Sequence, residues 1–110
     1  MKKISFDVDG TLLNQKHIQQ LAKQLVNDDQ YDVWIVTTRH ENSDTIDVYQ
    51  LAEEIGINFN NIVFTNGEYK GEILTLNKFD YHIDDCKLEI MTINKKGMTK
   101  AYHINDEIKL

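Results

Sequence analysis

Two closely spaced pairs of aspartates, Asp7 with Asp9 and Asp84 with Asp85, each follow a short apolar segment of this chain. Carboxylates that lie together repel one another and raise each other's pKa unless a cation sits between them. Oxygen-only ligands with few protein carboxylates suit Mg²⁺, which keeps water and phosphate as its other ligands. Neither His nor Cys residues cluster in a pattern that would favour zinc. If the two pairs meet in the fold, Asp84 and Asp85 are expected to hold Mg²⁺.

The same residues, with Thr37 and Lys70, have the chemistry of phosphoryl transfer. That reaction needs an in-line nucleophile, positive charge near the transferred oxygens and an acid for the leaving group. Asp7 can act as the nucleophile by forming an aspartyl-phosphate. Asp9 is near enough to protonate the leaving oxygen and then deprotonate the attacking water. Thr37 can donate a hydrogen bond to the phosphoryl group, and Lys70 can supply the fixed positive charge.

These side chains can meet only if the elements that carry them end at one edge of a sheet. Hydrophobic patterning predicts strands over residues 3–8, 32–37, 62–65, 81–83 and 99–104, and helices over residues 15–27, 43–55, 71–77 and 87–96. Strands that alternate with helices form parallel, doubly wound sheets. Such sheets bind ligands at the carboxyl ends of their strands, near a switch in strand order. The sequence therefore predicts an α/β fold, a Rossmann-like three-layer sandwich with a parallel five-stranded sheet.

The second helix is predicted in more detail. Ser43 can cap its first turn, and its inner face is expected to hold four apolar residues: Ile46, Tyr49, Ala52 and Ile55. Gly56 stands where helices often end in a left-handed residue, and Ile57 can make the accompanying apolar contact.

Size and composition limit what else the chain can be. A length of 110 residues predicts one domain over residues 1–110. A net charge of −6 argues against non-specific binding to nucleic acid. The single cysteine excludes an internal disulfide, and no apolar run is long enough for a membrane span. The acidic Asp7 follows Met1 too closely to leave room for the apolar stretch of a signal peptide. We therefore expect a cytoplasmic protein with no membrane partner.

The motifs, taken in order, resemble those of the haloacid dehalogenase superfamily. Residues 6–11, Phe-Asp-Val-Asp-Gly-Thr, resemble its first motif, an Asp-x-Asp-Gly-Thr after a strand. Residues 36–39, Val-Thr-Thr-Arg, are similar to the second motif, and residues 83–85, Ile-Asp-Asp, to the acidic fourth. Lys70, ahead of a short helix, fits the family's lysine. The resemblance runs from residue 3 to about residue 104 and keeps the order of the motifs.

The resemblance implies a phosphatase that uses Mg²⁺ and an aspartyl-phosphate intermediate. It implies that Asp7 and the backbone carbonyl of Asp9 join the acidic pair as metal ligands, with Asp9 also the acid and base. It further implies a phosphorylated substrate held by the residues around the first two motifs: Gly10, Thr11, Thr38 and Arg39. Residues 83–104 also resemble the end of the phosphatase domain of polynucleotide kinase-phosphatases. Those enzymes commonly have Arg where this chain has Cys86.

Several of these residues also have structural interpretations. A calcium loop that began at Asp7 would need Gly and Glu where this chain has Leu12 and Ile18, so that reading is disfavoured. Asp9-Gly10 could form a plain turn, and Thr37 could simply end a strand. Asp84-Asp85 could cap the helix that follows, a role compatible with metal binding.

The sequence leaves two choices among candidate site residues open and assigns structural roles to several others. Lys78 is a rival to Lys70 as the catalytic lysine. The sequence also leaves open which of Asp84 and Asp85 contacts the metal directly. Cys86 and Trp34 are interpreted as packing residues. The four histidines, which do not cluster, are interpreted as surface or partly packed: His17, His40, His82 and His103.

The predicted helices fill the gaps between the motifs and leave no room for a cap domain. An uncapped site should act on an exposed phosphate, such as a nucleotide or a nucleic-acid end, or be closed by a second copy of the chain. One alternative is a phosphoacceptor signalling module like bacterial receiver domains, although receivers place the acidic pair early and the acceptor Asp later. The other is a binding protein that keeps the fold without catalysis.

Overall fold

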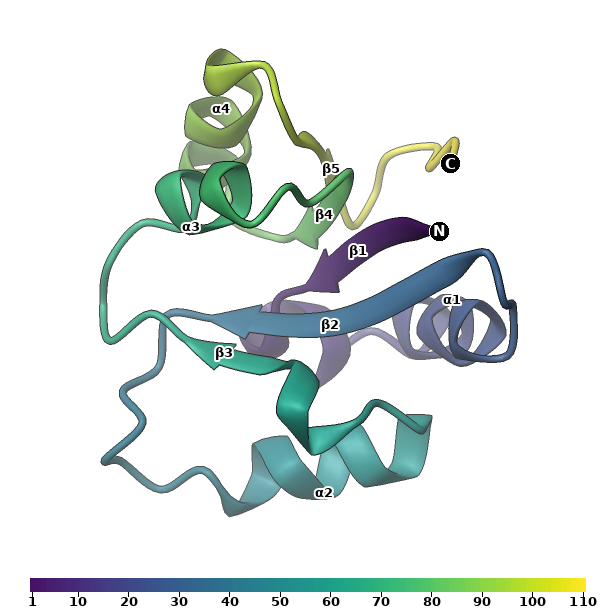
Figure 1. Cartoon of the computed structure of the whole chain (residues 1–110). Coiled ribbons are helices and arrows are strands. Elements are labelled where there is room, and N and C mark those ends of the chain that lie inside the picture. The colour runs from purple at the N-terminus through teal and green to yellow at the C-terminus, as the bar shows by residue number, and fades with distance from the viewer.

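Five parallel strands form one sheet, in the order β3-β2-β1-β4-β5, in the computed structural model, which describes residues 1–110 (Figure 1). The strands are β1 (Lys2–Phe6), β2 (Tyr31–Thr37), β3 (Ile62–Phe64), β4 (Tyr81–Asp84) and β5 (Lys100–His103). The predicted all-parallel five-stranded sheet is therefore confirmed, and its order is compatible with a Rossmann-like fold.

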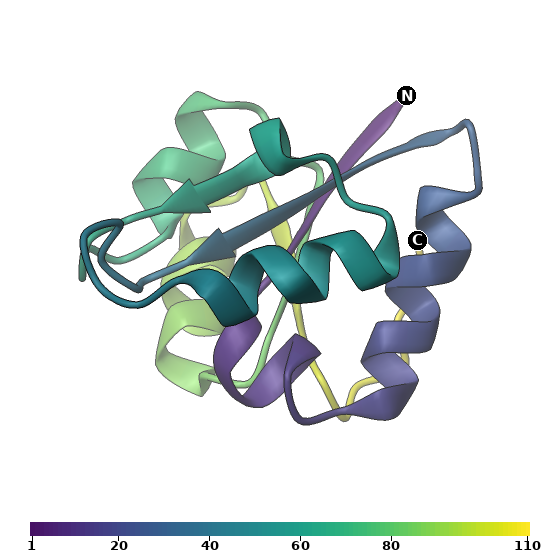
Figure 2. The same ribbon diagram turned by 90° about the horizontal axis from the view of Figure 1, so that it is seen from below.

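Helices cover both faces of this sheet (Figures 1 and 2). The helices are α1 (Lys16–Val26), α2 (Ile46–Ile55), α3 (Gly71–Leu76) and α4 (Lys87–Lys96). The apolar sides of α1 and α2 pack with β1, β2 and β4 in the larger core, and α3 and α4 share a smaller core with the opposite face. None of these helices is long and apolar enough to span a lipid bilayer.

The register of the sheet brings the candidate residues to one edge. Phe6, the last residue of β1, lies opposite Ile35 of β2 and Ile83 of β4. Because the strands are parallel, the segments that follow β1, β2 and β4 leave the sheet at the same edge. The chain places β2 and β3 on one side of β1 and then crosses to β4 and β5 on the other. The carboxyl ends of β1 and its two neighbours therefore mark the switch in strand order, where such sheets bind ligands.

The start of α2 differs from the prediction. The helix begins at Ile46, and the Ser43 hydroxyl donates to the His40 carbonyl at 2.7 Å instead of capping a helix. Ile46, its first residue, is 66% exposed. Ala52 and Ile55 are buried as predicted, together with Val48 and Leu51, and Tyr49 is half-buried, so only Ile46 was wrongly placed on the inner face. Residues 38–45 form a loop at the site edge of the sheet.

Two local details follow the sequence more closely. The helix α2 ends at Gly56 in the left-handed conformation, and Ile57 is buried in the core, as predicted. The first strand ends at Phe6, two residues earlier than predicted, because the chain turns tightly there. The amides of Leu12 and Leu13 donate to the carbonyls of Asp7 and Val8, which closes the turn that carries the first motif.

Candidate active site

Lys70 lies at the centre of a buried ion cluster at the carboxyl edge of the sheet. Its ammonium donates to Asp7 Oδ1 at 2.8 Å and to Asp84 Oδ2 at 2.6 Å, and its side chain is only 2% exposed. Asp7 follows β1, Asp84 ends β4, and Lys70 immediately precedes α3. One ammonium therefore joins three elements that are far apart in the sequence.

The charges in this cluster shift one another's pKa values. Burial works against the charged form of Lys70, but the carboxylates of Asp7 and Asp84 outweigh it and raise the lysine's pKa. Burial raises the pKa of Asp7 to about 7, in spite of the attraction of Lys70. Burial also acts on Asp84, yet hydrogen bonds from His82 and Lys70, together with the charge of Lys70, hold its pKa below the usual range. Of the two aspartates, Asp84 is therefore the more strongly held as an anion.

His82 supports Asp84 from beneath the cluster. Its Nε2 lies 2.8 Å from Asp84 Oδ2, and its Nδ1 lies 2.6 Å from the Ser5 hydroxyl. Burial lowers the pKa of His82 and favours the neutral ring. Since a carboxylate only accepts, Nε2 carries the proton and donates to Asp84, while Nδ1 accepts from Ser5. The backbone amide of Cys86 donates to Asp84 Oδ1 at 2.9 Å and completes its support.

The interpretation of His82 as a surface or partly packed residue was therefore wrong, because the ring is fully buried. Ser5 and His82 are direct neighbours across β1 and β4. Ser5 stands between the apolar Ile4 and Phe6, and His82 stands next to Ile83, which was the only available signal. The sequence shows the two polar positions but not the register that pairs them.

Three carboxylates, those of Asp7, Asp84 and Glu89, lie within 4.0 Å of the single ammonium, and a fourth, Asp85, lies beside them. Oxygens of Asp7, Asp84 and Asp85 lie within 4.8 Å of one another. Glu89, on the first turn of α4, accepts the backbone amide of Lys70 at 3.1 Å through Oε1. Its Oε2 is buried without a hydrogen-bond partner, 4.0 Å from the lysine ammonium, and burial raises the pKa of Glu89. The cluster thus has more carboxylate oxygens than its one ammonium can pair, and one Glu89 oxygen has no partner at all. Such oxygens are the ligands that a hard divalent cation such as Mg²⁺ prefers.

Asp9 is turned toward α2. Arg39 donates to both of its oxygens, at 3.0 and 2.7 Å, and also to both oxygens of Asp47 on α2, at 2.6 and 3.0 Å. The hydrogen bonds from Arg39 lower the pKa of Asp9, and the two carboxylates raise that of Arg39. Asp9 is therefore held as an anion, and it must leave Arg39 before it can carry a proton to a leaving group.

The remaining predicted residues lie around the cluster in different roles. The Thr11 hydroxyl donates to Asp7 Oδ2 at 3.2 Å and lies 3.4 Å from Asp85 Oδ1. Thr37 is buried, and its hydroxyl accepts the Arg39 amide at 3.3 Å, whereas Thr38 is exposed. Gly10 adopts a φ of 76°, and a side chain there would overlap the Asp85 carboxylate. The structure thus brings together most of the residues singled out in the sequence.

An open cleft of about 390 Å³ exposes this cluster. Its lining consists of Asp7, Asp9, Thr38, Gly67, Glu68, Tyr69, Lys70, Asp84, Asp85, Cys86 and Glu89. Lys78 is exposed beyond the far end of α3 and does not line the cleft. Cys86 is exposed at its rim, so its interpretation as a packing residue was wrong. Trp34 does pack, edge-to-face against Phe79.

Comparison with known proteins adds no assignment. No protein-family model matches the chain, and no curated protein matches its sequence.

The buried position of Asp7 predicts a pH dependence of stability in protein stripped of metal by a chelator. Its folded-state pKa, about 7, lies above its ordinary value of 3.8. Its stabilising contribution is therefore complete below about pH 4 and is lost as the pH rises toward 7. Asp7→Asn should unfold like the wild type at pH 4.5 but be about 1–3 kcal/mol more stable at pH 8.

Urea unfolding at the two pH values measures this difference. The matched control is Asp29→Asn, which changes an exposed aspartate outside the cluster. Parallel pH profiles for the wild type and Asp7→Asn would contradict the burial argument.

The close approach of Gly10 to Asp85 predicts a second outcome. Gly10 and Gly97 both have positive φ, 76° and 78°, but a side chain at Gly97 would meet nothing within 4 Å. Both Gly→Ala variants should lose about 1–2 kcal/mol of stability from backbone strain. Only Gly10→Ala should displace the Asp85 carboxylate, and it should weaken Mg²⁺ binding by roughly 10–100-fold in calorimetry. Equal Mg²⁺ affinities in the two variants would show that Asp85 does not hold the ion.

Proposed function

We propose that this chain is a Mg²⁺-dependent phosphomonoester hydrolase of the haloacid dehalogenase type, without a cap domain, in which Asp7 is transiently phosphorylated. The observation that carries the proposal is the buried Lys70 ammonium, which lies between the carboxylates of Asp7 and Asp84 in an open cleft. Three of the four motifs named from the sequence contribute a side chain to this one contact.

The surroundings of Asp7 suit a nucleophile. Lys70 binds one of its oxygens, Thr11 donates to the other, and the residue lines the cleft. In the first step an Asp7 oxygen attacks phosphorus and the bond from phosphorus to the leaving oxygen breaks. In the second step water attacks the same phosphorus and frees Asp7. Lys70 balances negative charge on Asp7 and on the transferred oxygens throughout.

The acidic cluster is the part of the site that would hold Mg²⁺. Asp7, Asp84, Asp85 and the backbone carbonyl of Asp9 are the proposed ligands, with the unpaired Glu89 oxygen close by. When bound, the ion supplies positive charge that offsets carboxylate repulsion and polarises the phosphoryl group. His82 and Cys86 keep the Asp84 carboxylate in a fixed orientation, a support that metal-binding carboxylates commonly need.

Asp9 is proposed as the proton carrier. As an anion it is ready to take a proton from the attacking water in the second step. To protonate the leaving group in the first step, Asp9 must leave Arg39, take up a proton from solvent and turn to the substrate. The attacking water of the second step then returns that proton to Asp9. Arg39 would keep a two-point contact with Asp47 during that exchange, so no arginine charge is left unpaired.

The order of the strands favours this proposal over a signalling receiver. Receivers have the flavodoxin-like order 2-1-3-4-5, whereas this sheet runs 3-2-1-4-5. The acceptor would also follow the first strand here, with the acidic pair near the end of the chain. The charged groups in direct contact around Lys70 speak against an idle binding protein, since buried ionic groups are costly unless function retains them.

The open cleft supports a site without a cap. The loops after β2 and β3 lie side by side at its rim (Figure 1), where the amide of Gly67 donates to the Thr38 carbonyl at 2.7 Å. A substrate can therefore reach Asp7 directly, or a second copy of the chain can close the site. The rim also holds Cys86 where polynucleotide kinase-phosphatases commonly have Arg, so we do not extend the proposal to their substrate.

Two variants separate the proposed roles of the aspartates. Asp7→Asn should abolish turnover of a phosphomonoester, because an amide is a poor nucleophile and a poor metal ligand. Asp9→Asn should keep Mg²⁺ binding, since its proposed metal contact is a backbone carbonyl. It should slow turnover by roughly 10²–10⁴-fold, and phosphorylated protein should accumulate with a leaving group that needs no proton. Steady-state kinetics with p-nitrophenyl phosphate and peptide mass spectrometry after acid quenching measure both effects.

The lysines provide the matched control. Lys70→Met should remove activity, whereas Lys78→Met, at the exposed rival lysine, should leave it within about twofold of wild type. Full activity in Asp7→Asn, or a phosphate found on the Asp9 side chain, would overturn the mechanism.

A further inference from the structure

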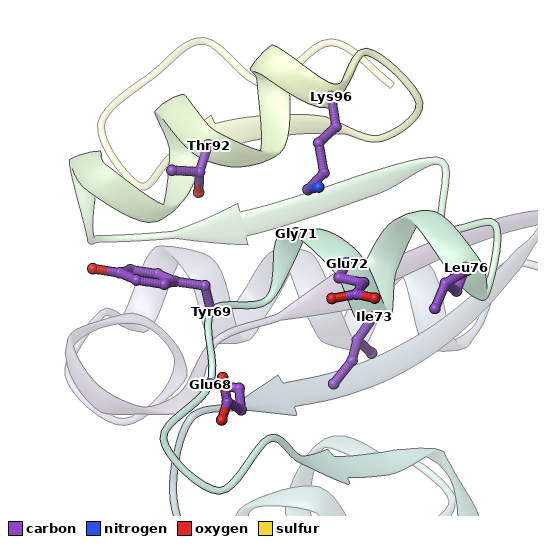
Figure 3. Close-up of a pocket in the computed structure, with 8 residues that line it drawn as sticks. All are labelled: Glu68, Tyr69, Gly71, Glu72, Ile73, Leu76, Thr92 and Lys96. Atoms are coloured by element: carbon purple, nitrogen blue, oxygen red, sulfur yellow. The ribbon is translucent and has the colours of Figure 1, made fainter.

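A second hollow, of about 570 Å³, lies between α3 and α4 (Figure 3). Its lining consists of Glu68, Tyr69, Gly71, Glu72, Ile73, Leu76, Thr92 and Lys96, and we refer to it as the α3–α4 groove. Glu68 and Tyr69 also line the cleft that contains Asp7. The groove therefore begins where the phosphate cleft ends, and its volume is in the range of small-molecule sites.

Tyr69 stands where the two hollows meet. It is 61% exposed, although its neighbour Lys70 is almost completely buried. The ring takes no part in the aromatic pairs of this protein, which involve Trp34, Phe79 and other residues. A free, exposed aromatic face is a platform on which a planar ring can stack.

Lys96 of α4 lies over Gly71, at the start of α3 (Figure 3). Gly71 has no side chain, so the Lys96 methylenes pass directly over α3, within 3.3 Å of where a Gly71 Cβ would stand. Figure 3 shows Lys96 and Thr92 projecting from α4 into the space above α3. Lys96 makes no ion pair within the protein, so its ammonium is free to donate to a ligand.

The charges of the groove limit the ligand. The carboxylates of Glu68 and Glu72 oppose a second phosphate and suit N–H or O–H donors. The net charge of −6 likewise disfavours a long polyanion. These features favour an uncharged planar ring that carries both donors and acceptors.

We propose that the α3–α4 groove is the leaving-group subsite, and that it selects phosphomonoesters whose leaving group carries a neutral heteroaromatic ring stacked on Tyr69, with a ring acceptor facing Lys96. This inference rests on the proposed function and adds the substrate class to it. Nucleoside monophosphates and pyridoxal phosphate share this chemistry, so both belong in the test.

The test compares kcat/KM for AMP, pyridoxal phosphate and β-glycerophosphate, which has no ring. Tyr69→Ala should lower kcat/KM for the preferred ring substrate by roughly 5–100-fold, mainly through KM, and leave β-glycerophosphate within about twofold. Lys96→Gln should act in the same direction by roughly 3–10-fold. The matched controls are Phe59→Ala, at another exposed aromatic residue, and Lys95→Gln, at the neighbouring exposed lysine.

The outcomes separate this inference from the proposed function. A selective loss on AMP alone or on pyridoxal phosphate alone supports the groove and identifies the source of the ring. Equal losses on all three substrates, or no loss, overturn the groove while the hydrolase stands. If the wild type hydrolyses no phosphomonoester, the proposed function fails. Calorimetry with AMP then tests whether the α3–α4 groove binds the ring. Weaker AMP binding by Tyr69→Ala supports ring binding there, and unchanged binding overturns it.

Discussion

The contact between the Lys70 ammonium and the carboxylates of Asp7 and Asp84 constrains the whole site edge of this protein. A buried charge is tolerated only with close, well-oriented partners, because an uncompensated charge away from water is strongly destabilising. The ends of β1 and β4 and the start of α3 must therefore meet at one place. The parallel register supplies that meeting point, because Phe6 and Ile83 are neighbours and the next residues are Asp7 and Asp84.

In the same contact, the protonation state of Asp7 that favours folding is not the one that favours catalysis. Asp7 is buried enough to raise its pKa to about 7, yet it must be an anion to attack phosphorus. Lys70 and a bound cation both favour that anion, so the site is expected to be least stable when it is ionised without metal. Asp84 has no such conflict, because His82 and Lys70 hold it as an anion. One carboxylate is thus kept reactive and the other is kept fixed, which is the division of roles expected of paired acids in an active site.

The sheet and the main cluster were predictable from sequence because each depends on local patterns. Alternating strand and helix periodicities define the parallel sheet, and residues directly after strands must lie at its carboxyl edge. The supporting residues depend on contacts that a sequence does not show. Ser5 reaches His82 only through strand register, and Glu89 reaches Lys70 only because α4 packs beside α3. Arg39 was expected at the substrate, but its position between Asp9 and Asp47 follows from where α2 begins.

The central claim is that phosphate passes through a covalent bond to Asp7, and the stereochemical course at phosphorus tests it most directly. Each in-line displacement inverts the configuration of the phosphoryl group, so attack by Asp7 followed by attack by water must give net retention. The measurement uses a phosphomonoester made chiral at phosphorus with oxygen isotopes. An alcohol replaces water as the second attacking group, and the configuration of the phosphate ester that it forms is determined. The account predicts retention of configuration. Inversion would mean that the acceptor attacks the substrate directly, and it would contradict the role assigned to Asp7.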